Sequence, residues 1–290
     1  LILRNIHLSF GGTPLLEDAG FSVSSGERLC LVGRNGSGKS TLLKLAAEMI
    51  EPDEGERYLQ PGTTVRYLPQ EPDLSGFETV REYVVSALGS GDEAHRANYL
   101  LEQLQISGHE SPAHLSGGEA RRAALAHVLA PEPDIILLDE PTNHLDLPAI
   151  EWLEEQLRSI RSALVLVSHD RRFLQNLSRA TTWLENGITR HLDKGFAEFE
   201  TWRDQILEKE DRDRHELNRK IAAEMQWLHK GVTARRKRNM GRLRALNALR
   251  EERRSQRKSP GNARMTVTDA DTSGKLVAET KHISKSFVGI

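Results

Sequence analysis

The sequence predicts an α/β domain with a parallel sheet, followed by a hairpin of two charged α-helices. Up to residue 192, short apolar runs rich in β-formers at 28–32, 135–138 and 163–167 alternate with helical segments, as in parallel strands joined by crossover helices. From 193 to 258 the composition changes to charged stretches with few glycines. A chain of 290 residues with 38% hydrophobic content can form two such units of unequal size.

Cysteine content and hydropathy predict a soluble protein of a reducing compartment. Cys30 is the single cysteine and lies in an apolar run, so we expect a buried thiol without a disulfide. The sequence has neither a signal-peptide pattern nor an apolar stretch of about 18 residues, the length that crosses a bilayer. We therefore expect a cytoplasmic location. The chain starts at Leu1 without methionine and stops in mid-pattern at Ile290, so we expect both ends to be cut.

Segment 33–40 has the full pattern of a phosphate-binding loop and lies between an apolar strand and a helical segment. Glycines let the backbone N–H groups point at phosphates, the Lys39 ammonium contacts the β and γ phosphates, and the Ser40 hydroxyl can bind Mg²⁺. A glycine-rich turn without nucleotide would not explain the strand, lysine, serine and helix together. The expected nucleotide-binding residues here are Gly33, Arg34, Asn35, Gly36, Ser37, Gly38, Lys39, Ser40 and Thr41.

An apolar strand at 135–138 ends in two carboxylates, Asp139 and Glu140. Because the carboxyl ends of parallel strands meet at one edge of a sheet, both side chains should lie near the phosphates. Asp139 suits the Mg²⁺ shell, and Glu140 suits a general base for the attacking water. Two acidic residues after a strand are commonly only a solvated strand end, so this assignment depends on the phosphate loop.

Segment 115–119 (Leu-Ser-Gly-Gly-Glu) predicts the start of a helix. Ser116 can cap it while Glu119 completes a capping box, and Gly117 and Gly118 would let a phosphate approach the exposed N–H groups. This helix end cannot easily reach the phosphate loop of its own domain.

The order and spacing of these segments resemble those of the ATP-binding cassette (ABC) family. In that family the signature segment of one cassette closes over nucleotide held by another. The resemblance implies a Q-loop glutamine at Gln70, a D-loop at 143–146, an H-loop at 168–170 with His169 near the γ-phosphate, and an adenine-stacking aromatic at Phe10. The signature residues would be Leu115, Ser116, Gly117, Gly118 and Glu119.

The same resemblance implies an ATPase that converts ATP and water to ADP and phosphate, with ATP and Mg²⁺ as its ligands. The catalytic residues would be Glu140, His169 and Gln70, and the metal ligands Ser40, Gln70 and Asp139. Taken singly, a histidine after a strand is more often structural, and an exposed phenylalanine is often an ordinary surface residue. The joint order of six elements favours the functional assignment.

After the H-loop the chain runs into the charged helices instead of a membrane domain. Apolar residues at 217, 221, 225 and 228 form one helical stripe, a break follows near 231–233, and a second run has apolar residues at 243, 246 and 249. Residues 5–10 are echoed at 282–287, which suggests the start of a second cassette. The expected domains are a cassette at 1–192 with a helical subdomain at about 71–130, a hairpin at 193–258, a connector at 259–275 and a truncated second cassette at 276–290.

This layout resembles that of ABC-F proteins, which carry two cassettes on one chain without a membrane domain. Within the family, segment 227–246 most resembles the Uup-like subfamily. The resemblance implies a partner cassette, either the second one of the chain or a homodimer mate. It also implies a ribosomal partner, since members act where linker helices approach tRNA.

The hairpin tip is strongly basic. From residue 230 to 258 there are twelve lysines and arginines against two glutamates, a net charge of +10 in a chain of net charge -2. Such a patch predicts contact with nucleic-acid phosphates by shape rather than by base sequence. A solvated helix face explains the mixed charges of 208–219 but not the tip, and the narrow apolar face makes a membrane surface a poorer fit. The candidate contacts are Lys230, Arg235, Arg236, Lys237, Arg238, Arg242 and Arg244.

Three functions remain open from the sequence. The leading hypothesis is a ribosome-associated translation factor whose ATP-bound form contacts rRNA and tRNA and whose hydrolysis releases it. The second is an ATPase acting on branched or duplex DNA, because the same arginines can hold DNA. A transporter subunit fits less well, and an adaptor without turnover does not need the complete catalytic set.

Overall fold

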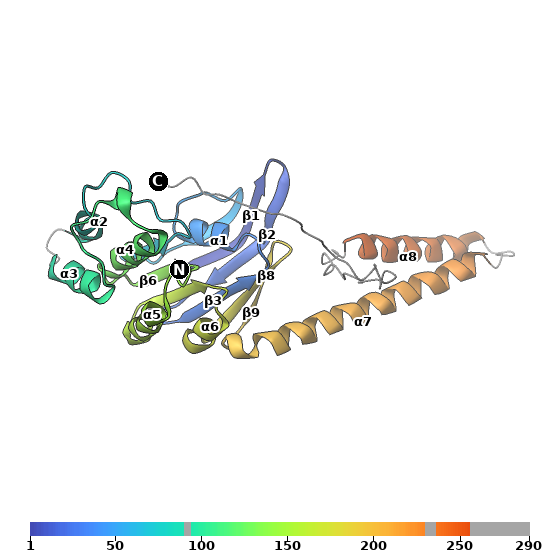
Figure 1. Ribbon diagram of the computed structural model, residues 1–290. Helices are drawn as coiled ribbons and strands as arrows, with labels where there is room; N and C mark the ends of the chain where they lie inside the picture. Colours follow the sequence, from blue (N-terminus) through green and yellow to red (C-terminus); the bar gives the residue numbers. More distant parts are fainter. Residues whose placement is uncertain (90–93, 230–235, 256–290) are drawn as a thin grey trace, which may run out of the picture. The chain divides into compact units, whose positions relative to one another are not determined.

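The computed structural model describes residues 1–89, 94–229 and 236–255. These residues form a nine-stranded sheet covered by helices on both faces and a pair of long helices, which confirms the predicted α/β class with its helical hairpin (Figure 1). The strands are β1 (Ile2–Phe10), β2 (Thr13–Ser22), β3 (Arg28–Gly33), β4 (Glu54–Tyr58), β5 (Val65–Leu68), β6 (Ile135–Asp139), β7 (Ala163–Val167), β8 (Ala180–Glu185) and β9 (Ile188–Leu192). The helices are α1 (Lys39–Ala46), α2 (Val80–Val85), α3 (Ala94–Gln103), the 3₁₀ turn η1 (Pro112–His114), α4 (Gly117–Leu129), α5 (Leu147–Ser159), α6 (Arg171–Leu177), α7 (Phe196–His229) and α8 (Arg236–Ser255).

The sheet order is β4-β1-β2-β9-β8-β3-β7-β6-β5. Strands β8, β3, β7, β6 and β5 run parallel, as the alternation of apolar runs and helices predicts. The antiparallel part formed by β1, β2 and β4 is not evident from that alternation. Strands β1 and β2 are joined at Gly11 and Gly12, whose φ angles of 57° and 82° suit a tight hairpin turn.

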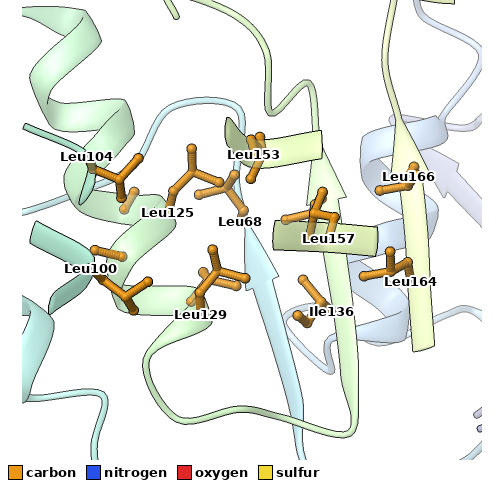
Figure 2. Close-up of a cluster of buried hydrophobic side chains, with 14 of the residues drawn as sticks. Leu68, Leu100, Leu104, Leu125, Leu129, Ile136, Leu153, Leu157, Leu164 and Leu166 are labelled. Carbon is orange, nitrogen blue, oxygen red and sulfur yellow. The ribbon is translucent and has the colours of Figure 1, made fainter. Parts of the chain in front are cut away.

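The central strands are buried on both faces, so their alternate residues enter two different cores. In β7, Leu164 and Leu166 pack toward α2–α6, whereas Val165 packs toward α1. The larger core joins α3 and α4 to α5 and the sheet through side chains such as Leu125 and Leu157 (Figure 2). Because parallel strands covered on both faces cannot slip without burying polar groups, the strand ends have fixed relative positions.

Helices α7 and α8 contact each other through a small cluster of Leu217, Ile221, Leu246 and Leu249. The predicted stripes continue further than this cluster, because Met225 is 38% exposed. Leu243 of α8 is exposed to a similar extent, at 39%. The predicted break at 231–233, the connector and the start of a second cassette lie outside the described residues.

No helix within the described ranges combines the length and apolarity that crossing a membrane requires.

Candidate nucleotide site

The predicted phosphate loop connects β3 to α1 at the carboxyl edge of the parallel strands. Gly38 precedes the first turn of α1 with φ 101°, a conformation that side chains rarely adopt. A Cβ at Gly33 would lie 2.5 Å from the carbonyl oxygen of Leu184, so this position requires glycine because β8 approaches closely. The glycines at these two positions therefore determine the shape of the loop. Arg34, Asn35 and Gly36 of the loop are exposed.

Lys39 folds back over the loop. Its Nζ donates hydrogen bonds to the carbonyl oxygens of Gly33 and Arg34, both at 3.0 Å. Burial lowers the pKa of this ammonium, while the charges of Glu140 and Asp139 act in the opposite direction. The cation of Lys39 is thus held at the loop with two carboxylates nearby, as a triphosphate site requires. Ser40 and Thr41 follow it, half-buried.

Two buried oxygens at the site are without partners. The hydroxyl of Ser37 and the Oδ1 atom of Asp139 form no hydrogen bond to any residue that the structure describes. The other carboxylate oxygen of Asp139, Oδ2, accepts a hydrogen bond from the Tyr67 hydroxyl at 3.2 Å. Burial, followed by the negative charge of Asp139, raises the pKa of Tyr67 well above its usual range. An unpartnered buried carboxylate oxygen is the kind of ligand that Mg²⁺ takes.

A magnesium ion would also need oxygens from the nucleotide. Across the described ranges, no group of three or more His, Cys, Asp or Glu side chains could hold a metal ion. Mg²⁺ is usually bound through one or two protein oxygens together with the phosphates of its substrate, so the predicted ligands Ser40 and Asp139 would supply part of such a shell. Gln70, the third predicted ligand, follows β5 and is exposed.

Glu140 and His169 come from different strand ends and meet. The buried carboxylate of Glu140 accepts a hydrogen bond from the backbone N–H of His169 at 3.0 Å, and its other oxygen lies 3.4 Å from His169 Nε2. Glu140 itself has φ 52°, and its N–H donates to the Val167 carbonyl at 2.8 Å. These bonds orient the carboxylate at the carboxyl edge of the sheet, while most of the His169 side chain is exposed.

Helix α4 begins in the predicted capping box. The Ser116 hydroxyl accepts a hydrogen bond from the Glu119 N–H at 3.3 Å, and the Ser116 N–H donates to the Glu119 carboxylate at 2.7 Å. The hydrogen bonds from Ser116 lower the pKa of Glu119. Since Ser116 and Gly117 are exposed, the positive end of the helix is open to a ligand.

The start of α4 also packs against the predicted D-loop. A Cβ added to Gly118 would lie 2.8 Å from the carbonyl oxygen of His144. Beyond it, Asp146 caps α5 by accepting a hydrogen bond from the Ala149 N–H at 3.3 Å. From the sequence we expected Gly118 to let a phosphate approach the helix N–H groups. The close approach of the His144 carbonyl is a second reason why this position requires glycine.

The remaining predicted residues are Phe10 and the basic residues of the arm. Phe10 ends β1 with 59% of its surface exposed, which leaves its ring available for stacking. In the arm, Lys230 and Arg235 lie outside the described residues, and Arg244 is exposed on α8. Four further predicted contacts belong to the residue range of α8, namely Arg236, Lys237, Arg238 and Arg242.

Sequence reasoning missed Arg121 of α4. Its side chain is buried, and its guanidinium donates to the backbone carbonyls of Gln70 and Glu140. The available signal was an arginine on a helix whose following residues, 123–130, are almost entirely apolar. Such a residue must either reach solvent or find buried acceptors, and sequence alone does not decide between them.

The model of the ABC transporter family matches residues 16–143. ATP-binding protein Uup of Caulobacter vibrioides is 45% identical over 99% of this chain and 47% of its own length, and Uup of Escherichia coli is 34% identical over 95% and 50%. The energy-dependent translational throttle protein EttA of Mycobacterium tuberculosis is 28% identical over 99% and 58%. The chain spans about half the length of the curated relatives it matches.

Solved structures agree with this match. The ATP-binding subunit of an ABC transporter has a TM-score of 0.59 at 26% identity, covering 67% of this chain and 90% of its own. A dimeric bacterial ABC transporter cassette has a TM-score of 0.57 at 25% identity, covering 67% and 98%. The fold and the order of its motifs define an ATP-binding cassette domain. The chain carries an ABC transporter domain, and its curated relatives include Uup and EttA proteins, which agrees with the resemblance of its motifs.

Proposed function

We propose that the chain binds Mg²⁺-ATP at the phosphate loop and hydrolyses it, with Glu140 as the general base. The observation that carries this proposal is the pairing of a buried, oriented Glu140 carboxylate with His169 beside Asp139 and Lys39. A base placed next to a metal-binding carboxylate can take the proton of the attacking water. Asp139 and Ser40 would hold a bound Mg²⁺ ion, which would neutralise charge on the phosphate oxygens.

Each residue of the site has one task in this proposal. The loop N–H groups and Lys39 bind the phosphates, and the unpartnered Ser37 hydroxyl donates to a phosphate oxygen. His169 donates to the γ-phosphate from its exposed imidazole, and Gln70 completes the metal shell. Phe10 stacks on the adenine. The open positive end of α4 binds the nucleotide of a partner cassette, which is either a second cassette of the protein or another copy.

Nucleotide state can reach the arm through the base of α7. Arg171, two residues after His169, forms an ion pair with Glu200 of α7. On β8, Trp183 lies beside Val32 of the loop strand and packs edge-to-face on Phe199 of α7, with ring centroids 6.0 Å apart. Both contacts join the first turns of α7 to elements that end at the nucleotide site, so they support a mechanical role for the arm.

We infer that the arm contacts rRNA and tRNA and that the protein is a ribosome-associated factor. Support comes from the +10 charge of residues 230–258 and from relatives named for translational throttling. Binding of branched or duplex DNA is the second candidate, favoured by the same basic residues. The ribosomal role and the DNA-binding role are distinguished by whether the ATP-bound protein binds ribosomes or DNA.

The experiment uses the full-length protein with Glu140→Gln and the equivalent change in its second cassette. Loss of the base should trap ATP, because a glutamine keeps an acceptor for the His169 N–H but cannot take a proton. The trapped protein is tested for sedimentation with ribosomes and for retention on branched DNA, with Lys39→Ala as the matched control. We expect ATP-dependent ribosome capture that Lys39→Ala abolishes. Capture by DNA alone would exclude the ribosomal role.

A second experiment tests the arm directly. Replacing Arg235, Arg236, Lys237 and Arg238 with glutamine should weaken ribosome binding and flatten its dependence on salt. Each lost phosphate contact should lower the slope of log K against log salt by about 0.7 to 0.9. An unchanged slope would mean that these side chains only solvate the arm.

A further inference from the structure

Arg121 is among the largest fully buried side chains in the described ranges, with 1% of its surface exposed. Its guanidinium donates to four backbone carbonyl oxygens. One terminal nitrogen, Nη1, donates to Pro69 and, at 3.2 Å, to Gln70. The other, Nη2, donates to Asp139 at 2.5 Å and to Glu140 at 2.6 Å.

These acceptors belong to two different segments of the proposed catalytic site. Pro69 and Gln70 follow β5, whereas Asp139 and Glu140 lie at the end of β6. Arg121 itself lies on α4, two residues after Glu119 of the capping box in the signature segment. A single side chain therefore connects the signature helix to the Q-loop segment and to the acidic strand end.

The geometry requires arginine. A planar guanidinium presents donors on two terminal nitrogens in fixed directions and can serve two pairs of carbonyls at once, whereas a lysine ammonium is a single point. Burial lowers the pKa of Arg121 to about 10, against the charges of Asp139 and Glu140, so the group remains protonated at neutral pH. The charge strengthens each of the hydrogen bonds.

We propose that Arg121 is a positioning residue that fixes the backbone at Gln70 and at Glu140 relative to the signature helix. The inference rests on the proposed function for its catalytic consequence. When α4 moves on meeting the nucleotide of a partner cassette, Arg121 carries the displacement to both segments. Binding of the partner's nucleotide at the start of α4 is then coupled to the position of the general base Glu140 in the same cassette. A residue that only stabilises the fold would not link them.

The test compares Arg121→Lys with Arg28→Lys. Arg28 is the matched control because its Nη2 also donates to backbone carbonyls, those of Arg158 at 2.8 Å and Ile160 at 3.5 Å, at the amino-terminal end of β3. In the full-length protein we expect Arg121→Lys to lower kcat by about tenfold to a hundredfold while the Kd for Mg²⁺-ATP changes less than about twofold. Arg28→Lys should change neither. Equal kcat in both variants would overturn the inference.

A second measurement does not depend on turnover. Hydrogen exchange in the nucleotide-free chain should be faster at the amides of Gln70 and Glu71, and at those of Asp139 and Glu140, in Arg121→Lys, with β7 unchanged. In Arg28→Lys both segments should keep the wild-type rates. If exchange in Arg121→Lys stays at the wild-type rate in either segment, Arg121 does not hold the two together. This result would stand even if the wild-type protein bound no nucleotide, so failure of the proposed function and failure of this inference are distinguishable.

Discussion

Alanine substitutions at the two glycines of the signature segment should differ in their effect on stability. Gly117 and Gly118 are adjacent in the first turn of α4. A Cβ at Gly117 would lie 4.0 Å from the His144 ring, an ordinary contact, whereas a Cβ at Gly118 would lie 2.8 Å from the His144 carbonyl oxygen. The obstacle at Gly118 is backbone, which cannot rotate away as a side chain can.

The size of the difference follows from two effects. Alanine is favoured over glycine in helices by up to about 1 kcal/mol, and this gain is common to both variants. Overpacking costs about 1 to 3 kcal/mol and applies only to Gly118→Ala. Subtracting one variant from the other cancels the helix contribution, so Gly118→Ala should be less stable than Gly117→Ala by about 1 to 3 kcal/mol.

Urea unfolding of both variants, followed by circular dichroism, measures this difference in free energy. We expect Gly117→Ala to match or exceed the wild type and Gly118→Ala to unfold at lower urea. Equal midpoints with equal slopes would refute the reasoning, because they would mean that the D-loop backbone moves aside without cost.

Further predictions concern the core and the helix cap. Leu157→Ala should lower the free energy of unfolding by about 2 to 5 kcal/mol, because this side chain is fully buried. Leu147→Ala in the same helix should have little effect, because Leu147 is exposed. Equal losses of stability in the two variants would contradict the assignment of the core. Ser116→Ala should destabilise the protein at neutral pH. The pKa of Glu119 is depressed below its ordinary 4.5, so the stabilisation is present above that value and lost as pH falls through the folded pKa. The gap between wild type and variant in thermal melts should therefore narrow on acidification below pH 4.5, and a constant gap would show that the hydroxyl does not bond the carboxylate.

Much of the site could be predicted from the sequence, because it is built from short local patterns. Parallel strands present their carboxyl ends at one edge, so the phosphate loop after β3 and the acidic pair after β6 were expected near each other, whereas the place of His169 after β7 was implied by the family resemblance. The capping box at Ser116 and Glu119 is equally local and is present as predicted. These features need no knowledge of which side chains pack together.

Features that depend on tertiary contacts were not predictable. The acceptors of Arg121 lie 18 or more positions away in sequence, so nothing near the arginine indicates that its charge is buried and bonded. The contact between Gly118 and His144 is of the same kind. In the arm, periodicity marked Met225 as part of the apolar stripe, but periodicity does not say how deeply each position of the stripe is buried. Pairing of the antiparallel strands β1 and β4 is likewise non-local.

Equilibrium binding of a fluorescent ATP analogue, in the presence of Mg²⁺, tests the central claim most directly. The wild-type chain should bind the analogue saturably at one site, and Lys39→Ala should weaken that binding by at least about tenfold, because the Lys39 ammonium is the cation held at the loop. Removing Mg²⁺ with a chelator should weaken wild-type binding as well. Absence of saturable binding by the wild type, or equal affinity of wild type and Lys39→Ala, would contradict the account.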